Sequence, residues 1–436
     1  MAELRRALGR WDLTAIGVNQ VIGAAIFLMP AQVAGQIGAW SPVAFVLTGL
    51  ASLSIALCFA EAGSRFEETG GPYLYTRVAF GRFAGFEVGW MQWFTRSASQ
   101  ATVMAGVVLA LGYYWPALTS GLPRALFLTV LTAALAWVNV RGIRESSLVV
   151  NTLTIGKLLP LALFVAAGIF SIDPARLVPH ETVTIQAATT AALLLVYTYG
   201  GYEVVPVVAG EAVAPRRHVP FAMIATIVIA AVVMTLTQLV AQGVLGDLAN
   251  HRTPIADAAA LLFGAGGALL VGAGSVISMT GNNAGGVLSG SRMLFALADQ
   301  GDLPVFFGRI HPRYRTPSNS VLFTSVVALL LALTGTFTTT AVVSALARLV
   351  AYAGVSAATL RMRSPRFAGV VKPATFTIPG GPTVPIVATA IAVAIIVGAT
   401  REQLLGGFAA LAVGAVLFAA AARSSGSTAR ERHART

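Results

Sequence analysis

Charged side chains are scarce in this chain: Asp, Glu, Lys and Arg together make up 11% of its 436 residues. A soluble domain carries about 25% charged residues, so too few charges are present to cover a water-facing surface of this size. Hydrophobic residues account for 56% of the chain, and the mean hydropathy is +0.78. The composition excludes a soluble globular protein, a disordered chain and a fibrous repeat, and it predicts a polytopic helical membrane protein.

Cysteine and histidine are also rare. The single cysteine, Cys58, cannot form an intrachain disulfide, and the Cys and His spacing matches no metal site. No nucleotide-binding Walker A motif is present, so the sequence predicts no metal and no cofactor. A membrane-embedded enzyme would need a base, nucleophile or metal set, and a channel would need a symmetric filter or a charged ring. Both classes are therefore less favoured, and the histidines fall in loops or in the tail: His180, His218, His251, His311 and His433.

Apolar runs long enough to cross a bilayer occur twelve times, given about 20 residues for about 30 Å of hydrocarbon. Each run is continuous, whereas the strands of a membrane β-barrel alternate between polar and apolar residues. The sequence therefore predicts an all-α protein with 12 transmembrane helices, near 13–37, 42–62, 83–112, 124–140, 147–170, 188–210, 219–244, 265–298, 318–335, 340–360, 383–400 and 403–422.

Basic residues are unevenly divided between the two sides that these spans define. Segments on the side of the N-terminus hold 21 Lys and Arg, and segments on the other side hold four. Because cytoplasmic loops carry the excess of positive charge, both termini are expected in the cytoplasm. The net charge of +12 is thus attributed to membrane topology, and no nucleic acid partner is expected. The abundance of Ala, Arg and Gly indicates a GC-rich bacterium, which predicts the bacterial cytoplasmic (inner) membrane.

An internal repeat is visible in the order of the runs. The first run is interrupted by small residues at 23–25 and the sixth by Gly200-Gly201, and each opens a group of five runs. Five spans is an odd number, so the second group is inverted relative to the first, which is a transporter architecture. We therefore expect a cytoplasmic N-terminal segment, two five-helix repeats, a pair of C-terminal helices and a basic cytoplasmic tail, at 1–12, 13–170, 188–360, 383–422 and 423–436.

Three stretches resemble motifs of the amino acid–polyamine–organocation (APC) transporters. They are GVNQVIGAAIF at 17–27, YTYGGYE at 197–203 with the GE and PRRHVP that follow it, and SGSR at 289–292 with ALADQGDLP and HPRYRTP after it. The resemblance covers roughly residues 10–360. It implies a LeuT-type 5+5 inverted-repeat fold and transport of amino acids or related amines. The chain departs from the usual Gly-small-Gly first break in having Ala25, whose methyl group narrows the expected docking space.

The first break is the leading candidate for a substrate site. A break inside the bilayer frees backbone groups that need partners, so it lines a cavity or is buried in protein. The free N–H groups of Ala24, Ala25 and Ile26 suit a substrate carboxylate, because a helix N-terminus carries about half a positive charge. An ammonium suits the carbonyls around Val21 and Ile22. Plain helix packing around Gly23 is the alternative.

The sixth run supplies the complementary half of the site. Gly200 and Gly201 are expected to unwind, and Tyr199 borders the gap. By resemblance, Tyr197 is an aromatic gate over the substrate, the alternative being a core tyrosine. Glu203 is a carboxylate at membrane depth, a position that favours a functional group. It is a candidate for binding a substrate amine, a proton or a nearby arginine.

Lys157 is the only charge between Leu148 and Phe170. Nine residues of helix place it about 14 Å into the bilayer, near the midplane. By resemblance, it occupies the position of a fifth-helix lysine that some APC members carry where relatives bind Na⁺. Lys157 is therefore predicted to substitute for a sodium ion and to be the proton-coupling group. A permanent charged tether without proton movement is the alternative.

Arg96 shares one helical face with Gln92, Ser99 and Gln100, at spacings of three and four residues. A polar stripe on a membrane helix faces the protein interior. An arginine there needs an acidic partner, for which Glu203 and an acidic substrate side chain are the two candidates.

The eighth run carries a stripe of small and amide residues that includes Asn282, a candidate for binding substrate. Such a stripe lines a pathway or serves helix packing. Arg292 at the cytoplasmic end of this run is predicted to pair with acidic residues when the inner gate is shut. Arg348 in the tenth run receives no role from the sequence.

Together these features predict a secondary active transporter that works by alternating access. Proton-coupled symport of an amino acid or amine is the leading mechanism, and exchange independent of sodium and protons is the alternative. The expected partners are the small-molecule substrate, a proton and membrane lipid. The chain is expected to be a monomer or a homodimer.

Overall fold

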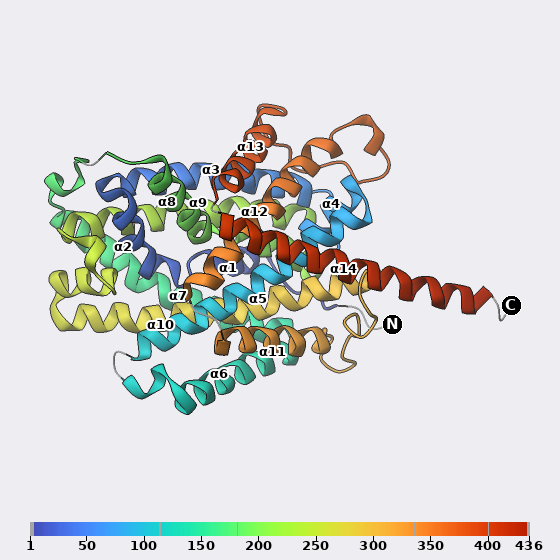
Figure 1. The fold of residues 1–436 in the computed structure, drawn as a ribbon, viewed down its shortest axis with the longest axis horizontal. Helices are drawn as coiled ribbons and strands as arrows, with labels where there is room; N and C mark the ends of the chain where they lie inside the picture. Colours follow the sequence, from blue (N-terminus) through green and yellow to red (C-terminus); the bar gives the residue numbers. More distant parts are fainter. Residues whose placement is uncertain (1–3, 113–114, 181, 335–336, 400, 434–436) are drawn as a thin grey trace.

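The computed structural model describes residues 4–112, 115–180, 182–334, 337–399 and 401–433, with the side chains in these ranges except those of 143–147, 337–346, 402–403 and 422–433. Its regular structure in these ranges is helical (Figure 1). The α-helices are α1 (Arg10–Val21), α2 (Ala25–Ile37), α3 (Ser41–Gly63), α4 (Pro72–Phe80), α5 (Arg82–Gly112), α6 (Gly121–Arg141), α7 (Ile143–Gly168), α8 (Ile185–Tyr199), α9 (Pro215–Val244), α10 (Pro254–Asp299), α11 (Ser318–Thr334), α12 (Phe337–Met362), α13 (Thr383–Val397) and α14 (Arg401–His433).

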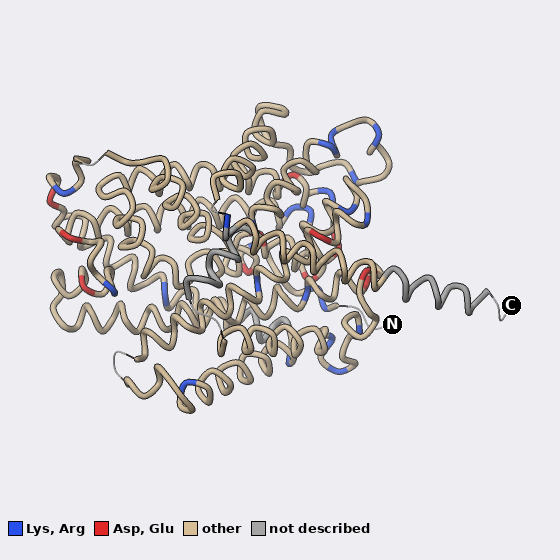
Figure 2. Tube along the Cα trace, viewed as in Figure 1, with Lys and Arg blue, Asp and Glu red and all other residues tan. Residues whose placement is uncertain are grey.

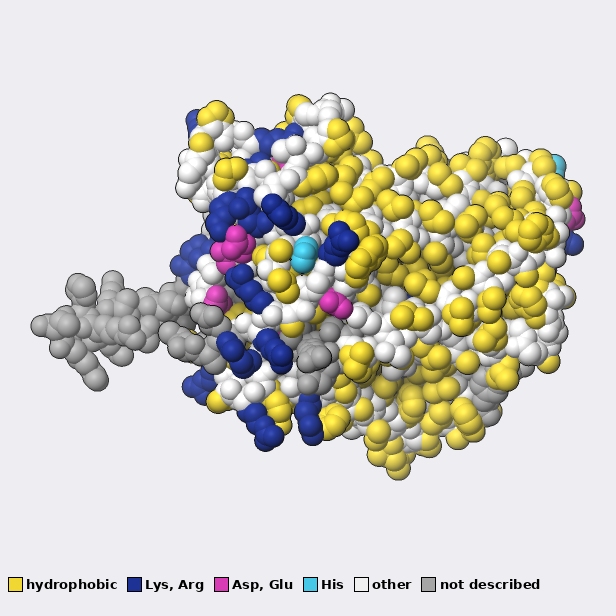
Figure 3. Space-filling model, turned by 180° about the vertical axis from the view of Figure 1, so that it is seen from behind, with side chains coloured by type: hydrophobic (Ala, Val, Ile, Leu, Met, Phe, Trp, Pro, Cys, Tyr) yellow, Lys and Arg dark blue, Asp and Glu magenta, His cyan; other side chains and the backbone are white. Residues whose placement is uncertain are grey.

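Much of the outer surface of this bundle is apolar. Figure 3 shows hydrophobic side chains spread over the broad flank of the molecule. Large apolar residues such as Leu47, Val130 and Ile155 are more than half exposed, which fits contact with lipid rather than water. Segments long and apolar enough to cross a membrane number seven in the described ranges: Ala25–Gly63, Gly121–Arg141, Leu148–Ser171, Ile185–Glu211, Pro215–Val244, Pro254–Asp299 and Leu404–Ala421.

Most Lys and Arg residues lie at one end of the molecule, where α1 begins (Figure 2). We call it the basic end and define it by Arg10, Arg77, Arg82, Arg217 and Arg309. The other end, called the opposite end, holds the loops between α7 and α8 and between α9 and α10. The segregation of charge along the long axis agrees with the alternating bias that the sequence shows across its predicted spans.

Two features of the chain differ from the predicted runs, whereas the first and sixth runs are each divided near the interruptions that the sequence predicts. The eighth run is preceded by a turn at Gly264 (φ 66°), and α10 begins at Pro254, eleven residues earlier than the run. The short helix α4 was not predicted. It begins at Pro72, after Gly71 (φ 42°), and ends at Phe80, before Gly81 (φ 97°). Proline at the start and glycine after the end are helix-boundary signals, but nine residues are too few for a membrane span.

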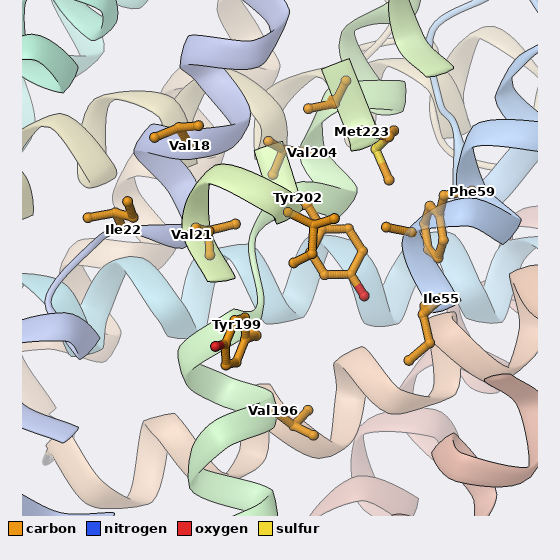
Figure 4. Close-up of a cluster of buried hydrophobic side chains, with 14 of the residues drawn as sticks. Val18, Val21, Ile22, Ile55, Phe59, Val196, Tyr199, Tyr202, Val204 and Met223 are labelled. Carbon is orange, nitrogen blue, oxygen red and sulfur yellow. The ribbon is translucent and has the colours of Figure 1, made fainter. Parts of the chain in front are cut away.

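The largest hydrophobic cluster surrounds the two divided segments. Figure 4 shows Val21, the last residue of α1, between Ile22 and the aromatic ring of Tyr202, which follows the division of the sixth run. The ring of Tyr202 stacks on Tyr352 of α12 with centroids 5.4 Å apart and meets Phe59 of α3 at 6.1 Å. This packing holds both divided segments in the centre of the bundle.

Candidate functional site

The first break separates α1 from α2. Helix α1 ends at Val21 and α2 begins at Ala25, and residues 22–24 are not helical. The first turn of a helix has no intrahelical acceptor for its amides. The amide of Phe27 donates to the Ala24 carbonyl at 3.1 Å, whereas in the described part of the chain the amides of Ala24, Ala25 and Ile26 have no acceptor. Three N–H groups at the positive end of α2 are therefore open to an anion.

The backbone carbonyls of the same break accept hydrogen bonds from other side chains of the protein. Lys157 of α7 is fully buried, and its Nζ donates to the Asn19 carbonyl at 2.8 Å, to Asn19 Oδ1 at 2.6 Å and to the Ile22 carbonyl. The hydroxyl of Ser278 donates to the carbonyls of Ile22 and Gly23, both at 3.1 Å. The Ile22 carbonyl, which the sequence offers to a substrate ammonium, thus has two donors from the protein already.

Helix α10 is joined to the end of α1 by hydrogen bonds from side-chain amides. Asn282 Nδ2 donates to the Gln20 carbonyl at 2.8 Å, and Gln20 Nε2 donates back to the Asn282 carbonyl at 2.7 Å. Asn19 Nδ2 donates to the Gly281 carbonyl at 2.6 Å. A Cβ added at Gly23 would lie 2.6 Å from Asn282 Nδ2. Asn282 therefore contacts the backbone of the break, and the polar stripe of the eighth run serves helix packing at this level.

The second break lies at Gly200 and Gly201, as the sequence predicts. Helix α8 ends at Tyr199, and the chain continues as a 3₁₀-helix, η5 (Tyr202–Glu211). A 3₁₀-helix of ten residues is unusual and marks a strained or hinge-like segment. Gly201 has φ 135°, and a Cβ there would lie 2.5 Å from the Gln20 carbonyl. The two breaks are therefore packed directly against each other.

Replacing Gly201 by alanine is expected to abolish correct assembly of the two breaks. The substitution combines a disfavoured φ with a clash against backbone that cannot rotate away, and strain of this kind costs about 1–3 kcal/mol before the clash is counted. The expected result is a large loss of folded protein, measured by size-exclusion chromatography after membrane extraction. Gly301→Ala is the matched control, since Gly301 also has a positive φ but no atom near its added Cβ. Equal yields for the two variants would contradict the prediction.

The carboxylate of Glu203 contacts side chains of two helices that are distant in the sequence, α5 and α12. Its Oε1 lies 2.7 Å from Arg96 Nη2 of α5 and 2.8 Å from Arg348 Nε of α12. Its Oε2 accepts hydrogen bonds from the Gly201 amide at 2.8 Å and from Tyr352 Oη at 3.0 Å. All of these side chains are at least 97% buried. Of the two partners considered for Arg96, the structure shows Glu203, and two guanidinium groups share one carboxylate.

Arg348 was missed as a site residue. Its Nη1 donates to the Tyr197 carbonyl at 3.2 Å, and its guanidinium carbon lies 6.0 Å from the centroid of the Tyr197 ring. A Cβ at Gly200 would overlap the guanidinium, so the second break is open enough for Arg348 only because residue 200 is glycine. The available signal was that Arg348 is the only charge in the tenth run, with Tyr352 one turn later.

The two tyrosines of the second break point in different directions. Tyr197 packs against Ala25 and Met29 of α2, and its hydroxyl neighbours are Ser99 and Thr102 of α5. It thus bridges the first break and α5. Tyr199 instead donates its hydroxyl to the Phe45 carbonyl of α3 at 2.8 Å. The hydroxyl of Tyr199, a residue that the sequence offers as a substrate contact, is therefore directed toward α3.

The basic end of the bundle is closed by buried ion pairs. Arg292 of α10 and Glu211 of η5 are both fully buried and form two hydrogen bonds of 3.0 Å. The amide of Leu8 donates to the Glu211 carbonyl at 3.0 Å, so the segment before α1 joins this closure. Asp302 is bound by Arg77 and Arg82 from the two ends of the α4–α5 turn.

The opposite end is hollow. A cavity of about 830 Å³ begins between the α9–α10 loop, at His251 and Asp257, and the outer part of α2. Its inner wall includes Gly106 of α5, Met279 of α10 and Phe27 of α2. Ala24 packs in the same apolar cluster as Met279. The cavity therefore extends from the opposite end to the first turn of α2, beside the first break.

A comparison with protein families adds a decisive observation. The model of a family described as amino acid permease matches residues 8–422, which is nearly the whole chain. The chain belongs to the amino acid permease family. This result confirms the resemblance to the APC transporters and, with the apolar helices, shows an integral membrane protein.

Curated relatives of the permease are transporters as well. It is 29% identical over 334 residues to the chloroplastic cationic amino acid transporter 9 of Arabidopsis thaliana, covering 71% of this chain but only 58% of that protein. It is 26% identical to the methylthioribose transporter of Bacillus subtilis strain 168 (89% of this chain, 87% of the relative). It is 27% identical to the serine/threonine exchanger SteT of the same strain (76% and 77%). The names of these relatives indicate transporters rather than enzymes.

The α9–α10 loop of the permease contains a pH-sensitive contact. His251 lies 2.8 Å from Asp257 and 3.0 Å from Asp247, and the hydrogen bond to Asp257 is the main cause that raises the pKa of His251 above its ordinary 6.5. The charged imidazole therefore stabilises the loop at low pH, and this contribution is lost as pH rises through the raised pKa. We expect amides of residues 247–257 to lose protection above pH 6.5 in hydrogen exchange corrected for intrinsic rates. His251→Gln should remove that pH dependence, and a profile unchanged by this substitution would contradict the assignment.

Proposed function

We propose that the permease is a secondary active transporter that carries amino acids across the cytoplasmic (inner) membrane by alternating access. The observation that carries this proposal is the pair of breaks packed back to back, with unpartnered amides beside a cavity. Discontinuous helices at the bilayer midplane are the binding elements of such transporters. The proposed architecture is twelve spans, ten of them in two inverted groups of five. With the basic end in the cytoplasm, the closed inner side and hollow outer side correspond to an outward-facing state.

The break amides support a substrate that has a carboxylate. Among the described residues, the amides of Ala24, Ala25 and Ile26 have no acceptor. Glu203, in contrast, already contacts two arginines, and the Ile22 carbonyl has two donors. An amine without a carboxylate thus finds no unpaired anion at the break. The neighbouring apolar wall of Val103, Val107 and Met279 suits an uncharged side chain. Within the range of amino acids and amines, neutral amino acids are the proposed substrates.

Proton symport is the proposed mechanism. The support is that the ammonium of Lys157 lies among three oxygens at the end of α1, an arrangement that a bound Na⁺ would otherwise occupy. This position makes sodium coupling unfavourable because two cations would repel each other. Exchange is the second candidate, and its support is the similarity to a serine/threonine exchanger.

The test is uptake by the purified permease in proteoliposomes. Neutral amino acids should be taken up saturably, and their decarboxylated amines should neither be transported nor compete. Accumulation driven by an inward proton gradient supports symport, whereas uptake that requires internal substrate and ignores the gradient supports exchange. Uptake of amines in preference to amino acids would overturn the proposed substrate class. Absence of any saturable uptake across the common amino acids would overturn the transport proposal.

A further inference from the structure

The starts of α1 and α9 form an exposed corner of arginine and aromatic side chains at the basic end. Trp11 is 60% exposed, and its ring meets that of Phe221 edge-on with centroids 5.1 Å apart. The guanidinium carbon of Arg10 lies 5.1 Å from the centroid of Phe221 and 5.8 Å from that of Trp11. Arg217 precedes Phe221 by one helical turn and therefore shares its face of α9. Two arginines thus flank an aromatic pair in which Trp11 is exposed and Phe221 is half-buried.

Neither arginine of this corner has an acidic partner. In the part of the chain that the structure describes, Arg10 and Arg217 form no ion pair, in contrast to Arg82, which binds Asp302. The nearest acid in sequence, Asp12, accepts the Gly9 amide at 2.9 Å and Asn151 Nδ2 at 2.8 Å. The forks of both arginines are therefore available to an external anion.

We propose that this corner binds the headgroup of an anionic phospholipid. Arginine presents a planar fork that matches phosphate oxygens. Exposed tryptophan is typical of the level of the headgroups, where its ring contacts acyl chains and its N–H contacts water. The cytoplasmic leaflet carries the anionic lipids that attract basic residues. The bound phosphate would neutralise Arg10 and Arg217 together and hold the start of α1 against α9. The proposal rests on the orientation given above but not on any substrate or coupling ion.

The experiment uses quenching of Trp11 fluorescence in the full-length permease in detergent micelles. Lipids with brominated acyl chains are titrated as phosphatidylglycerol or as phosphatidylcholine, and Trp11→Phe identifies the part of the signal that Trp11 supplies. Stronger quenching by the brominated phosphatidylglycerol is expected. Arg10→Gln with Arg217→Gln should weaken it, by roughly fivefold for each arginine removed. Arg309→Gln with Arg366→Gln is the matched control, because both arginines are exposed and have neither an aromatic nor an acidic contact among the described residues.

Two kinds of result would overturn the proposal. The first is equal quenching by the anionic and the zwitterionic lipid, or quenching that the Arg10 and Arg217 substitutions leave unchanged. The second is loss of quenching on addition of inorganic phosphate at the concentration of the lipid, which would assign the corner to a free anion. Size-exclusion profiles of both double variants establish that each is folded. None of these readouts requires transport, so failure here is distinguishable from failure of the proposed function.

Discussion

Replacing Glu203 by glutamine is expected to lower the free energy of unfolding by about 3–5 kcal/mol, because it leaves Arg96 and Arg348 buried without a counter-ion. Both guanidinium groups are at least 97% buried, and both lie within 2.8 Å of the same carboxylate oxygen. Glutamine retains the shape of the side chain, so the loss measures charge rather than packing. Thermal unfolding in detergent, followed by tryptophan fluorescence, provides the measurement.

The cluster also predicts an asymmetry between its members. Arg96→Gln should cost less than Glu203→Gln, since Arg348 still neutralises Glu203. The double variant Arg96→Gln/Glu203→Gln should lose less stability than the sum of the two single losses, because the effects of substitutions within one interacting network are not additive. Glu67→Gln is the matched control: its pair with Lys372 is exposed and is worth at most about 1 kcal/mol. Equal losses for Glu203→Gln and Glu67→Gln would show that the cluster does not hold the breaks together.

Replacing Lys157 by alanine is expected to reduce uptake by more than tenfold. The substitution removes the donor to two oxygens of Asn19 and to the Ile22 carbonyl, and each buried acceptor left unpaired costs about 1–3 kcal/mol. The end of α1 would then lose its bond to α7 beside the proposed substrate amides. Uptake of a neutral amino acid in proteoliposomes, with and without an inward proton gradient, measures the effect. Lys372→Ala, at an exposed position, is the control.

The same variant separates the two roles considered for Lys157. The oxygens left behind form a small cation site, so sodium, compared with choline, is expected to restore part of the uptake of Lys157→Ala without restoring its response to the proton gradient. Proton-driven accumulation that survives the substitution would eliminate Lys157 as the coupling group. Equal uptake in sodium and choline would mean that the site does not accept Na⁺ in place of the ammonium.

The positions of the two breaks show how much of this site the local sequence predicts. Consecutive glycines at 200–201 predict an interruption of a membrane helix because glycine weakens helices and tolerates positive φ. The interruption at 22–24 follows from similar reasoning, although α2 includes Ala25, which the sequence places in the break. Which side chains donate to the carbonyls at the first break could not be predicted from the sequence. Ser278 and Lys157 reach the Ile22 carbonyl from helices that are more than 130 residues away in the chain.

The sequence by itself determined the membrane class, the approximate positions of the long helices, the charge asymmetry and the two breaks, because hydropathy, charge and glycine act locally along a helix. Only the tertiary structure decided that Arg348 joins Arg96 on Glu203, that Tyr199 faces α3 and that the open cavity lies at the opposite end. These results depend on which faces of distant helices meet. A buried charge in a run of apolar residues reveals that a partner is needed, but the packing of the bundle determines which partner it is.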